Sequence, residues 1–379
     1  MNKIYLDNNS TTQLDPRILE KMIPFFSEKF GNPSSKTHSF GWEAEASIEK
    51  SRQEIASLIN AEKSEIIFTS GATESNNLVL LNNNSKNNHI ITMSIEHKAI
   101  LDICKELEKQ NVYVTYLNPD KNGLLDINKI RQNISSKTTL ISIMHANNEI
   151  GVIQPIHKIG EICNNNNIPF HVDAAQSLGK ISIDVKKMNI DFLSLSSHKI
   201  YGPKGIGCLY INKKHYNKLK PILHGGSQER SLRPGTLAVP LIIGFGEACK
   251  ILKEEQRDES AKILKYRKLF IEKIKAEIPD VKINGDEIKR IPGNINLSFP
   301  SLKGQSIISA MPLLAVSGGS ACTSSSPKPS HVLKKIGLDN KLINSAVRIC
   351  IGRFNTNEEI TIAANTIIKI VKQKSSYKY

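Results

Sequence analysis

Short apolar runs alternate with amphipathic segments along the first two-thirds of the chain. Apolar runs of this length predict buried strands, and helical segments between them predict the crossovers that parallel strands need. The pattern therefore predicts an α/β fold with one large, mostly parallel sheet of seven strands. The expected strands are residues 65–70, 89–93, 112–116 and 139–144, a run ending at Asp173, a run ending near Lys199, and residues 207–211.

Helix signals surround these strands. Asp15 is a suitable N-cap and Pro16 suits the first helical position, so we predict a helix from Asp15 to Phe30. A second amphipathic helix is expected over residues 43–60.

The last third of the chain has a different pattern. A long polar helix near residues 253–278 is expected to leave the sheet domain, and a strand over 294–299 and a helix from about Asn357 follow it. This order predicts a smaller α+β domain. We expect a large domain of residues 15–255 and a small domain that combines residues 1–14 with 256–379.

Two of the expected strands end in groups that carry chemistry. One ends at Asp173 and the other leads to Lys199. Open α/β sheets place their ligands at the carboxyl ends of strands. A lysine that can form a Schiff base, with an aspartate that can keep a pyridine nitrogen protonated, is what a pyridoxal phosphate (PLP) enzyme needs.

A glycine turn offers a site for the phosphate of such a cofactor. Gly71 follows an expected strand and opens a helix, where backbone N–H groups and the helix dipole favour an anion. Thr73, Ser196 and His198 could add donors. Taken alone, the turn is equally a capped strand-to-helix connection. The similar glycine pattern over 202–207 lies between two strand-like segments, so we interpret it as a tight turn.

The six cysteines show no paired metal-binding spacing, and we expect no metal site. Five lie in apolar segments and are expected to be buried. Cys322 differs, because small and polar residues surround it. This composition predicts a mobile, exposed loop over about residues 316–329 with a reactive thiol.

The chain is strongly basic, with 51 Lys and Arg residues against 36 Asp and Glu residues. The lysines are spread along the sequence and form no tract with an interleaved aromatic platform, so we expect a solvated surface and no nucleic-acid partner. The N-terminal residues lack the apolar run of a secretory signal, and no stretch is long and apolar enough for a membrane span. These features predict a cytoplasmic protein without a membrane association.

Motifs of one enzyme family follow one another in order along nearly the whole chain. They lie at residues 5–12, 30–35, 69–77, 96–98, 147–151, 171–176, 196–207, 224–226 and 233–236, in the Cys322 segment, at Arg348, and at 352–354. Through them the chain resembles the cysteine desulfurases of the NifS/IscS type, which are class V, fold-type I PLP enzymes.

The resemblance implies a role for each matching residue toward PLP. Lys199 would form the Schiff base, Asp173 would pair with the pyridine nitrogen, and Gln176 would bond the ring oxygen. His97 would stack on the ring and move protons. The phosphate would be bound by Ala72, Thr73, Ser196 and His198, with Thr236 coming from the other subunit of a homodimer.

The resemblance also implies the substrate and the reaction. Asn148 and Arg348 would hold L-cysteine, Arg348 through its carboxylate. The Cys322 thiolate would take the substrate's sulfur as a persulfide and leave L-alanine. The persulfide would then pass to an iron–sulfur scaffold protein or to another acceptor, such as a tRNA-thiolation partner.

Three other functions remain open at this point. A selenocysteine lyase would share the PLP residues and have little need of Cys322. A class V aminotransferase would require a keto-acid acceptor and no reactive cysteine. A basic binding protein on a retired PLP scaffold would have no use for Lys199, Asp173 and His97.

Overall fold

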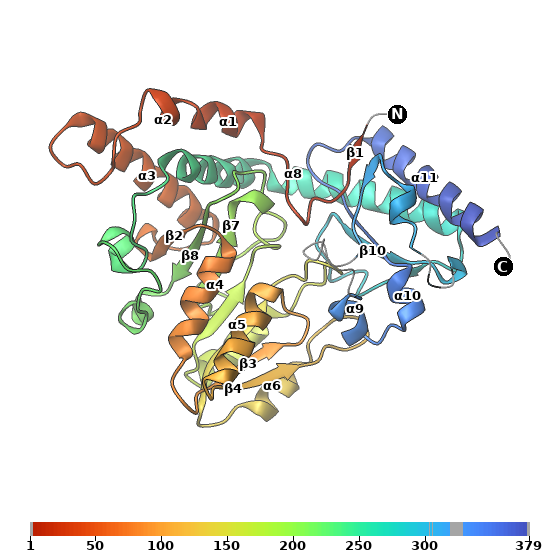
Figure 1. Ribbon diagram of the computed structural model, residues 1–379, viewed down its shortest axis with the longest axis horizontal. Helices are drawn as coiled ribbons and strands as arrows, with labels where there is room; N and C mark the ends of the chain where they lie inside the picture. Colours follow the sequence, from red (N-terminus) through yellow and green to blue (C-terminus); the bar gives the residue numbers. More distant parts are fainter. Residues whose placement is uncertain (1–2, 303, 305, 319–328, 377–379) are drawn as a thin grey trace.

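The computed structural model describes residues 3–302, 304, 306–318 and 329–376, and its centre is a seven-stranded sheet (Figure 1). The strand order is β2-β8-β7-β6-β5-β3-β4, and β8 alone runs antiparallel to its neighbours. The predicted α/β fold with a mostly parallel sheet is confirmed. The strands are β2 (Ile66–Thr69), β3 (His89–Met93), β4 (Tyr113–Leu117), β5 (Thr138–Met144), β6 (Phe170–Asp173), β7 (Phe192–Ser196) and β8 (Gly207–Ile211).

Helices connect the strands and cover the sheet. Strands β6, β7 and β8 are buried along their whole length, so that their apolar residues on both faces and their few polar side chains are all covered. The helices of this part are α1 (Pro16–Met22), α2 (Pro24–Ser27), α3 (Ser39–Leu58), α4 (Ala72–Leu80), α5 (Lys98–Lys109), α6 (Ile127–Asn133) and α7 (Ile156–Asn165).

Two helix predictions differ from the structure. Asp15 is the N-cap as predicted and accepts a hydrogen bond from the Arg17 N–H, but the helix is interrupted at Ile23. Pro24 then starts α2, because a proline has no N–H to continue the first helix. The long helix α8 (Val239–Glu277) begins well before the predicted residue 253, because its first half is apolar and packs on the sheet side.

The second unit has its own small sheets and its own core. Three antiparallel strands, β9 (Lys282–Ile283), β10 (Asn294–Ser298) and β12 (Val347–Cys350), lie near the parallel pair β1 (Ile4–Tyr5) and β11 (Leu314–Ala315). Helices α8 and α11 (Asn357–Ser376) pack against each other there (Figure 1). Two short helices, α9 (His331–Lys335) and α10 (Asn340–Asn344), complete it.

Helix α8 contributes to both hydrophobic cores. Its residues Ile242 and Leu252 pack with the large sheet, while Phe270 and Ile274 pack with the second unit. The helix passes through residue 255 without a break. The domain boundaries proposed from the sequence therefore stay a prediction. No helix of the described ranges combines the length and the apolar character that crossing a membrane requires.

A buried ion-pair cluster joins the two units. Arg353, which follows β12, donates from Nη1 to Asp15 Oδ2 (2.8 Å) and from Nε to Glu259 Oε2 on α8 (2.8 Å). Burial alone would raise the pKa of Asp15, but hydrogen bonds from Arg17 and Arg353 outweigh burial and lower it to about 2. The Asp15 carboxylate therefore stabilises the fold at neutral pH, and this contribution is lost as the pH falls from about 4 toward 2.

We expect Arg353→Met to lower the free energy of unfolding by about 3 kcal/mol, because it leaves two buried carboxylates without their shared cation. Arg17→Met is the matched control. Arg17 also bonds Asp15, but its side chain is half exposed, and we expect a loss of less than about 1 kcal/mol. Urea denaturation at neutral pH measures both. Equal losses for the two variants would contradict the role given to Arg353.

Candidate active site

A cavity of about 550 Å³ lies at the carboxyl ends of the strands of the large sheet. It lies next to the last residues of β5, β6 and β7, where α/β sheets place their ligands. The cavity brings together ten of the residues predicted from the sequence: Ala72, Thr73, His97, Asn148, Asp173, Gln176, Ser196, His198, Lys199 and Arg348.

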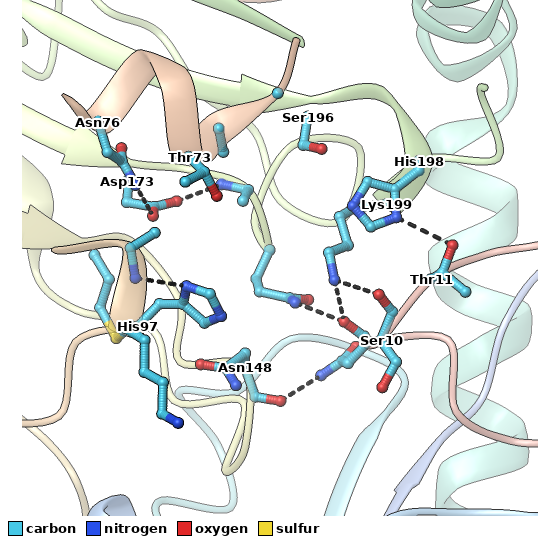
Figure 2. A pocket seen from close by; sticks show the side chains of 18 of the residues that line it. Ser10, Thr11, Thr73, Asn76, His97, Asn148, Asp173, Ser196, His198 and Lys199 are labelled. Carbon is cyan, nitrogen blue, oxygen red and sulfur yellow. Dashed lines mark hydrogen bonds between the residues drawn. The ribbon is translucent and has the colours of Figure 1, made fainter. Parts of the chain in front are cut away.

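Asp173 ends β6 and is held by two hydrogen bonds (Figure 2). Its Oδ2 accepts from Asn76 Nδ2 (2.8 Å), and its Oδ1 accepts from the Ala175 N–H (3.0 Å). The carboxylate is almost fully buried and has a fixed orientation. An ionised carboxylate only accepts hydrogen bonds, so this group suits a protonated ring nitrogen.

Lys199 lies across the cavity from Asp173, in a short helical turn that follows β7 (Figure 2). Its Nζ donates to the backbone oxygens of Asn9 (2.7 Å) and Ser10 (2.6 Å). These oxygens belong to a turn near the N-terminus of the chain. The amine therefore has a defined place at the cavity wall, which is the geometry that a Schiff-base lysine requires.

His97 is the N-cap residue of α5. Its Nδ1 accepts a hydrogen bond from the Ala99 N–H (3.1 Å). In the neutral ring the proton is therefore on Nε2. This bond fixes both the orientation of the ring beside the cavity and its tautomer (Figure 2).

One end of the cavity is suited to an anion. The N-terminus of α4 faces it, and a Cβ placed on Gly71 would meet no described atom within 4 Å, so the approach to the helix is open. His198 Nδ1 lies 3.0 Å from the Thr11 hydroxyl. Burial lowers the pKa of His198 to about 4, and the charges of Lys199 and Lys204 act in the same direction. The positive surroundings favour a phosphate here.

Arg348 contributes a buried guanidinium to the same cavity. Its Nη2 donates to Asp7 Oδ1 and to the Ser10 hydroxyl (both 2.7 Å), and its Nη1 donates to the backbone oxygen of Asn148 (3.0 Å). Its Nε is buried and has no hydrogen-bond partner in the described part of the chain. A buried donor of this kind favours an anionic ligand, such as a substrate carboxylate.

Several residues of the site lie within the motifs found in the sequence but were given no role there. Asn76 is polar but fully buried on α4. A polar residue among the apolar residues of one helix face can be recognised in a sequence. Glu149 is buried beside Arg348 and His97, and burial raises its pKa to about 7. Asn9 and Ser10 act through backbone oxygens, which leave no pattern in a sequence.

The cavity leaves two predicted site residues to account for, one exposed and one outside the described residues. Thr236 is exposed in this chain, and the described cavity residues do not include it. Cys322 and most of its predicted loop, residues 319–328, lie outside the described residues. The other five cysteines are buried, as predicted. The described ranges contain no group of three or more His, Cys, Asp or Glu side chains arranged to hold a metal ion.

The residues of the cavity fit PLP. A fixed buried carboxylate, an amine and an anion site that faces a helix N-terminus surround one space. The unpartnered Nε of Arg348 adds a place for a carboxylate of a substrate. Such a site on a mostly parallel sheet defines a PLP-dependent enzyme of fold type I.

Comparisons with known proteins agree. The family model "Aminotransferase class-V" matches residues 4–362. The cysteine desulfurase IscS of Ehrlichia chaffeensis is 52% identical over 375 residues, which cover 98% of this chain and 91% of the relative. The cysteine desulfurase IscS of Neisseria meningitidis is 50% identical over 368 residues, covering 96% and 91%.

Solved structures give the same result. A NifS-like protein superposes with a TM-score of 0.89 at 36% identity and covers 98% of this chain and 100% of its own. SspA in complex with cysteine superposes with a TM-score of 0.83 at 38% identity, covering 93% and 100%. The chain belongs to the class V aminotransferase family of PLP-dependent enzymes and, within it, to the cysteine desulfurases of the NifS/IscS type.

Proposed function

We propose that this enzyme removes the sulfur of L-cysteine, leaves L-alanine and carries the sulfur as a persulfide on Cys322. One observation carries the proposal: the buried guanidinium of Arg348 faces the same cavity as Lys199 and Asp173. An amino-acid substrate anchored by its carboxylate at Arg348 would place its α-carbon near the lysine. The relative SspA, solved in complex with cysteine, supports this choice of substrate.

Each cavity residue has a part in the proposed reaction. Bound PLP supplies an electron sink for the substrate's α-carbon. Lys199 would hold the cofactor, and its amine would move the substrate's α-proton. Asp173 would keep the ring nitrogen protonated, and Gln176 would bond the ring oxygen. His97 would stack on the ring and move protons through its Nε2.

Substrate and phosphate are bound at separate places in the cavity. Arg348 and Asn148 orient the substrate through its carboxylate. The phosphate would be held at the start of α4 by Ala72 and Thr73. Ser196, at the end of β7, and His198, just after it, would add two more donors.

Cys322 completes the reaction. Its thiolate attacks the sulfur of the substrate, and an S–S bond forms while the substrate's Cβ–Sγ bond breaks. The electron pair of the broken bond remains with the carbon, which takes up a proton and becomes the methyl group of alanine. The persulfide then passes to an iron–sulfur scaffold protein or to another acceptor such as a tRNA-thiolation partner. The acceptor and the cytoplasmic location stay predictions.

Two variants separate the cofactor from the sulfur chemistry. We expect Lys199→Ala to lose the visible absorbance of the Schiff base, because no amine remains to form it. We expect Cys322→Ser to keep that absorbance and to lose persulfide formation and sulfur delivery. Absorbance spectra and assays of alanine and sulfide measure both effects.

Each alternative function has a distinct outcome in the same assays. Normal sulfur delivery by Cys322→Ser would contradict the proposal. Full activity of Cys322→Ser on selenocysteine alone would indicate a selenocysteine lyase. Alanine formation that requires a keto acid would indicate an aminotransferase, and a colourless wild-type preparation would favour a binding protein.

The proposed enzyme is a homodimer in which Thr236 reaches the partner's phosphate site. Exposure of Thr236 in a single chain supports this arrangement. We expect a mixed dimer of Lys199→Ala chains with Thr236→Ala chains to recover about half the wild-type activity per dimer. One of its two sites then combines an intact Lys199 with an intact Thr236 from the other chain.

Co-expression with two different affinity tags isolates this mixed dimer, and each homodimeric variant is the control. If Thr236 acted within its own chain, both sites of the mixed dimer would be defective, and activity would not rise above that of the homodimers. That result, or a particle with the mass of one 42.1 kDa chain, would contradict the shared site.

A further inference from the structure

A second lysine, Lys180, lies behind the cavity wall that holds Lys199. Its Nζ donates to Gln176 Oε1 (3.0 Å) and lies 3.3 Å from Asn9 Oδ1. Lys180 and Lys199 also line a second, smaller cavity of about 20 Å³. Nothing in the sequence analysis assigns a role to Lys180.

The bonds of Lys180 select one orientation for a side-chain amide. A protonated amine can only donate, so Gln176 must turn its oxygen toward Lys180 and its nitrogen away. The nitrogen then donates to the backbone oxygen of Asn9 (2.8 Å), which also accepts from Lys199 (2.7 Å). An amide has two N–H groups, and the bond to Asn9 uses one of them.

The amide of Asn9 is fixed in the same way. Its Oδ1 faces Lys180, and its Nδ2 donates to the backbone oxygen of Asn148 (3.2 Å). The backbone oxygens of Asn9 and Asn148 favour the same orientations, because each can only accept a hydrogen bond. Lys180 adds a bond from a second side, and without it each amide is fixed only by one backbone oxygen. A rotated Gln176 would present an oxygen to the cavity in place of a nitrogen.

We propose that Lys180 is a positioning residue that holds the Gln176 amide with its nitrogen toward the cavity, so that the site presents an N–H donor to the phenolic oxygen of PLP. The inference rests on the proposed role of Gln176 toward PLP and deepens it. Lys180 acts through Gln176 and is not among the described residues that line the large cavity.

The charges around Lys180 determine the pH range in which its amine is protonated. Burial lowers the pKa of Lys180 to about 7, and the positive charges of Lys199 and Arg348 act in the same direction, whereas Cys350 and Glu259 raise it. The amine is protonated, and so donates only, below that pH. Experiments on Lys180 should therefore include a pH of about 6.

The test uses the holoenzyme and a pH titration of its visible absorbance. A donor to the phenolate favours the deprotonated form of the chromophore, so we expect Lys180→Met to raise the titration midpoint by about one unit. We also expect the affinity of the apoenzyme for PLP near pH 6, measured by equilibrium dialysis, to fall by about tenfold. Lys180→Arg keeps a group that can only donate, and its midpoint should stay close to the wild-type value.

A double-mutant cycle separates orientation from charge. Gln176→Leu removes the amide, and we expect Lys180→Met to cause no further shift of the midpoint in that background. A through-space effect of the Lys180 charge would persist there. An equal shift in both backgrounds would therefore overturn the proposal, as would a midpoint for Lys180→Met that equals the wild-type value.

Failure of the inference is distinguishable from failure of the proposed function. If Gln176→Leu alone moves neither the midpoint nor the PLP affinity, the donor role of Gln176 and the inference on Lys180 both fail. Alanine and persulfide formation by the wild-type enzyme would still test the desulfurase reaction. If Lys180→Met does not fold, a midpoint of Lys180→Arg raised by about one unit would overturn the donor role of Lys180.

Discussion

The site depends on residues 7–12. This short segment forms hydrogen bonds with Lys199, which follows β7 of the large sheet, and with strand β12 of the second unit. Asp7 pairs with Arg348 (2.7 Å), and Asn8 Nδ2 donates to the backbone oxygen of Cys350 (2.8 Å). The backbone oxygens of Asn9 and Ser10 accept from Lys199. A segment held on both sides in this way fixes the distance between Lys199 and Arg348, to which we assign the substrate carboxylate.

Positively charged side chains gather in and beside the cavity. Their burial is unfavourable, but their charge favours the binding of anions. Lys199, Lys180 and Arg348 lie near one another, and burial disfavours such a group unless each cation has acceptors. Backbone oxygens, side-chain amide oxygens and Asp7 supply these acceptors. The charges that remain unbalanced favour an anionic cofactor and an anionic substrate, which is what the proposed chemistry needs.

Much of the fold, and the position of Asp173 and Lys199 in one site, could be predicted from the sequence. Apolar runs that end in Asp173 and Lys199 placed both residues at one edge of the sheet, because parallel strands end together. The start of α8 could not be predicted from a polar pattern, since its first half is buried against the sheet. Pro24 could have indicated a break in the sequence, but the apolar pattern continues across this position and favoured one long helix.

The contacts that orient the site were beyond a sequence-based prediction. Backbone oxygens of Asn9 and Ser10 have no residue signature, and Lys180 looks like one lysine among many until its amine is found beside Gln176. The contacts with Asn9 and Ser10 join residues more than 160 positions apart, such as Gln176 with Asn9 at a separation of 167. Only the folded chain brings them together.

The central claim is that sulfur from cysteine is carried on Cys322, and mass spectrometry of the intact and digested holoenzyme tests it most directly. The protein is mixed with one equivalent of L-cysteine in the absence of a reductant or an acceptor, then alkylated and digested. We predict that the mass of one additional sulfur atom appears on the peptide that contains Cys322 and on none of the peptides with the five buried cysteines. Alanine formation with no added sulfur on Cys322, or with the sulfur on another cysteine, would contradict the account.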